Sequence, residues 1–117
     1  ANNLLPYITQ TAIGRLKEFQ VYGSDYATKD GSCVRDYIHV SDIAHAHVLA
    51  LKKLSEDKGS LNYDVINLGS GNGVSVFEII NAFEKENNLK LNYSVGPRRD
   101  GDVESIYSNS AKAKEIL

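Results

Sequence analysis

Short apolar runs alternate along this chain with stretches in which apolar residues recur at helical spacing. That spacing predicts four helices, and the runs between them predict four strands. The predicted helices cover about residues 6–17, 43–54, 76–83 and 110–117, and the predicted strands cover 19–23, 34–40, 65–68 and 91–95. Polar loops are predicted at 24–32 and 96–102, and a turn at 58–62. The order α-β-β-α-β-α-β-α indicates an α/β fold.

Two of the predicted helices have start signals. Ser75 and Glu78 have the spacing of a capping box, in which each side chain satisfies a free amide at the helix start. Ser41 and Asp42 offer side-chain oxygens that could cap the helix after them. Gly14 lies inside the first predicted helix, where a glycine is a weak point.

The composition is typical of a globular protein with one domain. The chain has 117 residues, of which 42% are hydrophobic and 24% charged. Its net charge is −2 and its basic residues are scattered, which argues against binding to nucleic acid or to an anionic membrane. No apolar run reaches the about 18 residues of a membrane span. The single cysteine, Cys33, cannot form an internal disulfide, which favours a reducing, cytoplasmic setting.

Two patterns that resemble cofactor or metal sites are incomplete. The glycines of residues 69–73 follow a predicted strand, but Val74 stands where the dinucleotide-binding fingerprint requires another glycine. We interpret these glycines as a tight turn and predict no cofactor site there. His45 and His47 diverge on a helix, and Cys33 completes no tetrahedral ligand set, so we predict no metal site.

Arg35 lies between apolar residues of a predicted strand, where an unpaired guanidinium is too costly. Two kinds of partner remain open. One is an internal carboxylate, from Asp36 or Asp102. The other is a phosphate, which planar bidentate donors would hold together with Arg98 or Arg99. The free amides at the start of the first helix would also suit a phosphate.

One string is more specific than the glycines: residues 34–40 read Val-Arg-Asp-Tyr-Ile-His-Val, and Asp-Ile-Ala follows at 42–44. Further strings occur at 2–8 (Asn-Asn-Leu-Leu-Pro-Tyr-Ile), 22–26 (Tyr-Gly-Ser-Asp-Tyr), 67–71 (Asn-Leu-Gly-Ser-Gly) and 98–102 (Arg-Arg-Asp-Gly-Asp). In this order they resemble the UDP-glucose 4-epimerases, which are NAD-dependent extended short-chain dehydrogenases/reductases. The resemblance covers essentially the whole chain. It implies that residues 1–117 are a C-terminal UDP-sugar-binding lobe, a small mixed sheet with flanking helices.

The resemblance also implies binding roles for nine residues, and it favours the phosphate clamp for Arg35. By position in the family, the phosphates are contacted by Asn3 and Leu4, the uracil is lined by Gln20, Val21 and Tyr22, the pyrophosphate is held by Arg35 and Arg99, and the ribose hydroxyls donate to Asp102. Ile106 matches a position near the sugar. It is neither the large aromatic residue nor the smallest residue found there in the family, so acceptance of N-acetylated sugars stays open.

The family reaction interconverts UDP-glucose and UDP-galactose in galactose metabolism by NAD-dependent oxidation at C4, rotation of the 4-keto intermediate and hydride return. It needs a glycine-rich turn for NAD and a Tyr-x-x-x-Lys pair that supplies the base. None of the seven tyrosines here is followed by lysine four residues later. We therefore expect a fragment without the N-terminal NAD-binding Rossmann domain, which has no catalytic residue, binds no NAD and is inactive alone.

The resemblance places the native homodimer contact in that N-terminal domain. We expect the fragment to expose apolar surface and therefore to self-associate in a non-native way. Two other interpretations remain. The parent could be a related nucleotide-sugar epimerase or decarboxylase acting on UDP-glucuronate, or the chain could be a stand-alone module that binds nucleoside diphosphates or proteins.

Overall fold

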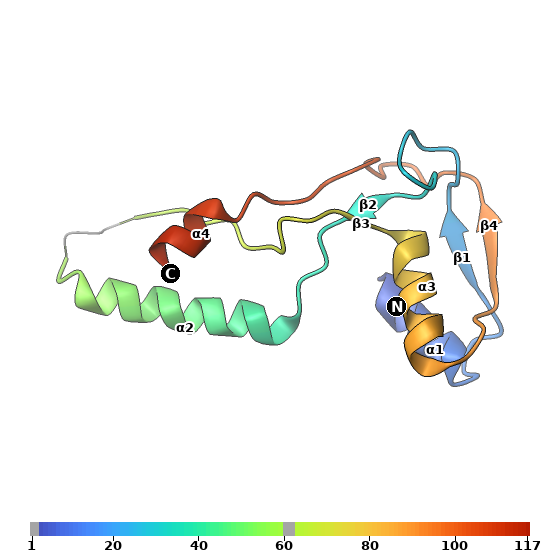
Figure 1. Ribbon diagram of the computed structural model, residues 1–117, viewed down its shortest axis with the longest axis horizontal. Coiled ribbons are helices and arrows are strands. Elements are labelled where there is room, and N and C mark those ends of the chain that lie inside the picture. Colours follow the sequence, from blue (N-terminus) through green and yellow to red (C-terminus); the bar gives the residue numbers. More distant parts are fainter. Residues whose placement is uncertain (1–2, 60–62) are drawn as a thin grey trace. The chain divides into compact units, whose positions relative to one another are not determined.

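The computed structural model describes residues 3–59 and 63–117, which form two compact units. The first unit comprises Ala1–Arg35 and Val74–Ile106, and the second comprises Asp36–Gly73 and Tyr107–Leu117. The elements are α1 (Leu4–Ala12), β1 (Phe19–Tyr22), β2 (Val34–Arg35), α2 (Val40–Glu56), β3 (Val74–Ser75), α3 (Val76–Asn87), β4 (Tyr93–Gly96) and α4 (Ala111–Ile116), as Figure 1 shows. Within the described residues this is the predicted order of helices and strands.

In the first unit, β1 and β4 lie side by side as a parallel two-stranded sheet (Figure 1). Side chains of β1 alternate between buried and exposed, as expected for a strand with one covered face. Gln20 and Tyr22 therefore point away from the core. On β4, Tyr93 lies beside Phe19 of β1, with ring centroids 5.7 Å apart, and keeps 36% of its surface exposed.

In the core of the first unit, side chains of α1 and α3 pack against this sheet. The buried members of this core are Ile8, Phe19, Val21, Ile80 and Leu91. The predicted capping box is confirmed: the Ser75 hydroxyl accepts from the Glu78 amide at 3.1 Å, and the Glu78 carboxylate accepts from the Ser75 amide at 3.3 Å. This start positions α3 so that Ile80 is fully buried.

A second, antiparallel pair is formed by β2 and β3, in which Val34 faces Ser75. Val34 also bridges in parallel to Ser105, because its amide donates to the Glu104 carbonyl and its carbonyl accepts from the Ile106 amide, both at 3.0 Å. Parallel and antiparallel pairing therefore both occur, but in two separate small sheets and not in the single mixed sheet that the resemblance implied.

The first helix is shorter than predicted. α1 ends at Ala12, with Ile13 as its C-cap, and Gly14 has φ of +81°, a left-handed conformation that glycine adopts easily. Gly14 therefore lies beyond the end of the helix and not inside it.

Two strand predictions are wrong. Only Val34 and Arg35 of the predicted strand 34–40 are in a ladder. Residues 36–39 have no strand partner, and the Asp36 carboxylate instead accepts from two serines of the second unit. The run 65–68 forms no strand, and the third strand lies at Val74–Ser75 instead. Val65 is 59% exposed, since a short apolar run is buried as a strand only where another strand pairs with it.

The start of α2 also differs from the prediction. His39 is the N-cap, and its ring Nδ1 accepts from the Ser41 amide at 3.2 Å, so neither Ser41 nor Asp42 caps the helix. Past the helix end, Lys58 and Gly59 have φ of +47° and +87°, which agrees with the predicted turn. The rest of that turn, residues 60–62, lies outside the described residues.

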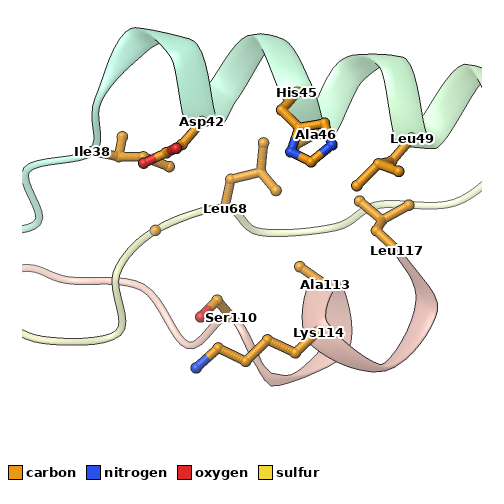
Figure 2. Close-up of a pocket in the computed structure, with 11 residues that line it drawn as sticks. Ile38, Asp42, His45, Ala46, Leu49, Leu68, Ser110, Ala113, Lys114 and Leu117 are labelled. Carbon is orange, nitrogen blue, oxygen red and sulfur yellow. The ribbon is translucent and has the colours of Figure 1, made fainter.

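In the second unit, α2 and α4 line a cavity of about 230 Å³, into which Leu68 projects (Figure 2). Lys112 of α4 pairs with Asp64 and also donates to the Val65 carbonyl at 2.8 Å. The side chains of α2 are at most half-buried. None of the nine predicted binding residues lies in the second unit, so the candidate site belongs to the first.

Candidate functional site

The guanidinium groups of Arg35 and Arg99 converge on the carboxylate of Asp102. From one oxygen, Oδ1, the distances are 2.9 Å to Arg99 Nη2, 3.3 Å to Arg99 Nε and 4.0 Å to Arg35 Nη2. Two positive charges and one negative charge leave this cluster with a net positive charge. Of the carboxylates that the sequence left open for Arg35, the structure selects Asp102.

Backbone contacts around β2 place Arg35 beside Asp102. Arg35 Nη1 donates to the Val34 carbonyl at 2.8 Å and to the Val103 carbonyl at 2.6 Å. The Val34 carbonyl also accepts from the Ile106 amide, so Ile106 lies next to the cluster, with 56% of its surface exposed. Arg35 is thus anchored at Nη1, while its Nη2 faces Asp102.

Arg99 links this cluster to the exposed side of β1. Its Cζ atom lies 5.2 Å from the centroid of the Tyr22 ring, within the range of a cation–π contact. The hydrogen bond to Asp102 raises the pKa of Arg99. More than half of the Arg99 side chain is exposed, and it can therefore meet an anion that arrives from solvent.

Arg98, the other arginine that the sequence left open, points elsewhere. Its Nε lies 2.9 Å from an Asp25 carboxylate oxygen, its Nη2 donates to the Asp25 carbonyl at 2.8 Å, and its Cζ lies 4.2 Å from the Tyr26 ring centroid. The hydrogen bond from Arg98 lowers the pKa of Asp25. Gly23 allows this packing, because a Cβ there would lie 2.6 Å from the Tyr26 ring. Arg98 therefore anchors the loop that carries Arg99.

Asp25 and Tyr26 are not among the residues for which the sequence predicts a role. The one sequence signal for them is the family string at 22–26, which contains both residues next to Gly23. Their contacts with Arg98 join two loops that are far apart in the chain, and residue spacing does not reveal such contacts.

The two neighbours of Tyr22 on β1 offer different groups. The Gln20 amide lies against Gly96 on the exposed side, where a Cβ on residue 96 would come within 1.7 Å of Gln20 Nε2. Val21 is only 2% exposed and belongs to the core. A ligand on this side could therefore reach the side chains of Gln20 and Tyr22, but only the main chain of Val21.

The start of α1, where Asn3 and Leu4 are predicted to contact phosphate, offers free backbone amides. Asn3 is the N-cap, has an extended backbone and makes no side-chain capping bond, and the helix begins at Leu4. The first amides of a helix then have no intrahelical acceptor and favour an anion. No contact of the described residues ties this helix start to the arginine cluster, so its part in the same site stays a prediction.

The histidines make local contacts. His39 Nδ1 lies 2.6 Å from the Ser41 hydroxyl, and His47 Nδ1 lies 2.7 Å from the Ile43 carbonyl on the preceding turn of α2. In residues 3–59 and 63–117, no group of three or more His, Cys, Asp or Glu side chains could hold a metal ion. No helix in the same ranges is long and apolar enough to cross a membrane.

Comparison with known proteins identifies the family. The model of the NAD dependent epimerase/dehydratase family matches residues 1–69. The chain belongs to this family. UDP-glucose 4-epimerase 4 of Oryza sativa subsp. japonica is 51% identical over 113 residues, which are 97% of this chain and 30% of that protein. UDP-glucose 4-epimerase of Mus musculus is 51% identical over 116 residues, which are 99% of this chain and 33% of that protein.

A solved epimerase structure also matches this chain. The crystal structure of UDP-glucose-4-epimerase from Stenotrophomonas maltophila, with bound NAD and formylated UDP-arabinopyranose, has a TM-score of 0.94 at 46% identity. The match covers 100% of this chain and 34% of that one. The predicted family and fold class are therefore confirmed, and the chain spans about a third of the length of the relatives it matches.

The glycine turn of this family member does not fit the pyrophosphate of NAD. A Cβ on Gly69 would lie 1.9 Å from the Ser108 hydroxyl and 2.0 Å from an Asp36 carboxylate oxygen, so side chains of the same unit fill the space beside the turn. The Ser70 amide, which could face a phosphate, donates to Asp36 at 2.9 Å. The turn therefore holds three segments of the second unit together.

Proposed function

We propose that this chain is the UDP-sugar-binding part of an NAD-dependent UDP-glucose 4-epimerase, which interconverts UDP-glucose and UDP-galactose. The observation that carries the proposal is the convergence of Arg35 and Arg99 beside the exposed ring of Tyr22. Planar guanidinium donors match the oxygens of a diphosphate, and an aromatic ring beside them suits a base. Relatives that are about half identical carry the name UDP-glucose 4-epimerase.

The nine predicted residues then divide the ligand between them. The diphosphate binds to the arginine pair and to the free amides at the start of α1. The uracil lies on the exposed side of β1, and the ribose hydroxyls donate to a carboxylate. In this arrangement the phosphates are held by Arg35, Arg99, Asn3 and Leu4. The uracil is lined by Gln20, Tyr22 and the main chain of Val21. Asp102 accepts from the ribose hydroxyls, and Ile106 lies near the sugar.

The chemistry of the reaction requires groups that we place in other parts of the full-length protein. NAD, when bound there, accepts and returns the hydride, and a Tyr-x-x-x-Lys pair supplies the base. The residues of this chain bind and orient the nucleotide, so the chain alone is inactive. Incubation with UDP-galactose and NAD should give no UDP-glucose, and turnover above the level of a contaminant would contradict this part of the proposal.

Titration calorimetry with UDP tests the binding role. The wild-type chain should bind UDP, and Arg99→Gln should lower the affinity at least about tenfold, because each hydrogen bond to a charged group contributes about 1.5–3 kcal/mol. Arg15→Gln is the matched control, since it removes the same charge from an exposed position of the first unit. Equal UDP affinities for the two variants would refute the proposed clamp.

The proposal also covers the cellular location of the protein and the self-association of this chain. We place the protein in the cytoplasm, because Cys33 is a free, buried thiol, and we assign the native homodimer contact to other parts of the full-length protein. This chain alone self-associates through α2, whose exposed apolar residues include Val48 at 62% and Leu51 at 68%. The occupant of that surface is a second copy of the chain.

A further inference from the structure

Asp102 already occupies the donors that an anionic ligand needs. Its Oδ1 accepts from both Nε and Nη2 of Arg99, at 3.3 and 2.9 Å, and these two donors form one edge of the guanidinium fork. A phosphate that binds this edge in a bidentate way must displace the carboxylate. Arg35 has no such conflict, because its Nη1 stays on the carbonyls of Val34 and Val103.

We propose that Asp102 is a built-in counter-ion that competes with anions for Arg99 and so selects against small anions that lack sugar hydroxyls. The inference rests on the proposed function for the nature of the anion, a diphosphate. The counter-ion role itself depends only on the contacts among Arg35, Arg99 and Asp102.

The selectivity follows from the burial of Asp102. Its side chain is 15% exposed, so a displaced carboxylate has little access to water and needs new hydrogen-bond donors. An inorganic diphosphate brings no sugar hydroxyl and no base, and its negative charge repels the freed carboxylate. A nucleoside diphosphate adds hydroxyl donors and a base, which offset the loss of the pair.

A structural role for Asp102 predicts a different result. If the carboxylate only ordered the loop 96–102, its removal would weaken the binding of every anion. If it competes for Arg99, removal strengthens the binding of inorganic diphosphate while nucleotide binding gains less. The affinities for two ligands therefore separate the two roles.

The experiment is titration calorimetry of the 117-residue chain with inorganic diphosphate and, separately, with UDP. Asp102→Asn is compared with Asp100→Asn, which removes the same charge from an exposed position of the same loop. We expect Asp102→Asn to bind inorganic diphosphate about fivefold more tightly than Asp100→Asn, which corresponds to about 1 kcal/mol. The ratio of UDP affinity to diphosphate affinity should fall in Asp102→Asn.

Three results decide the question. Equal or weaker diphosphate binding by Asp102→Asn, or no detectable binding, overturns the counter-ion role. Tighter diphosphate binding by this variant, with no UDP binding by the wild type, supports the counter-ion role and refutes the proposed function instead. Amide spectra report whether Asp102→Asn folds, and if it does not, Asp102→Ser provides the same comparison.

Discussion

The carboxylate of Asp36 accepts hydrogen bonds from Ser70 and Ser108 and so joins three segments of the second unit. Replacing Asp36 with asparagine removes the negative charge of this side chain. Oδ1 accepts from the amide and hydroxyl of Ser70, at 2.9 and 2.6 Å, and Oδ2 accepts from the amide and hydroxyl of Ser108, at 3.1 and 2.7 Å. These hydrogen bonds lower the pKa of Asp36, first through the Ser70 side chain and then through that of Ser108. The ionised carboxylate is therefore the form that stabilises the fold.

The expected loss for Asp36→Asn is about 2–3 kcal/mol of the free energy of unfolding of the second unit. The new amide nitrogen cannot accept, so one serine amide loses its acceptor, although a hydroxyl can rotate to accept from the amide. The remaining bonds lose their charge assistance, and hydrogen bonds to charged groups contribute about 1.5–3 kcal/mol each. The half-buried position of Asp36 keeps some access to water and limits the loss to about that range.

Amide hydrogen exchange measures this loss for each unit separately, because α2 belongs to the second unit and α3 to the first. Asp36→Asn should speed exchange in α2 at neutral pH and leave α3 unchanged. Glu56→Gln is the control, since it removes one negative charge from an exposed position of α2. An α2 exchange rate equal to that of Glu56→Gln would refute the assigned role of the carboxylate.

The lowered pKa of Asp36 also predicts that the free energy of unfolding depends on pH. The folded-state pKa of Asp36 lies below the unfolded value of about 3.9. Its contribution is therefore complete well above that value and is lost as the pH falls toward the folded pKa. The difference in unfolding free energy between wild type and Asp36→Asn should shrink as the pH drops below about 4, and a growing difference would contradict the reasoning.

Three further variants test the first unit and the exposed helix. Ser75→Ala should lower the unfolding free energy of the first unit in urea by about 1–2 kcal/mol, because the N-cap of α3 is lost; an unchanged midpoint would contradict the capping role. Gly31→Ala should cost at least about 2 kcal/mol more than Gly101→Ala, since both glycines have positive φ but only at position 31 would a Cβ lie 2.0 Å from a backbone carbonyl oxygen, that of Ser24. Leu51→Lys should reduce the self-association seen by sedimentation at high concentration, and a monomeric wild-type chain would refute the proposed contact.

Local signals predicted the elements that depend on near neighbours in sequence. The capping box before α3 joins residues three apart, and the apolar stripe behind it repeats along a single helix, so both are visible in the chain itself. The predicted strands at 34–40 and 65–68 failed for the opposite reason, since a strand exists only where another segment pairs with it. The end of α1 was predicted too late because Gly14 was expected to be tolerated inside the helix.

The family and the arginine positions follow from the sequence, because the strings around Arg35 and Arg99 are contiguous residues in a specific order. Tertiary structure alone decided how those residues pair. Arg98 and Arg99 are neighbours with the same chemistry, yet one bonds to Asp25 and the other to Asp102. That choice depends on which distant segments approach the loop and on the direction in which each side chain leaves the backbone, and neither is encoded by residue spacing.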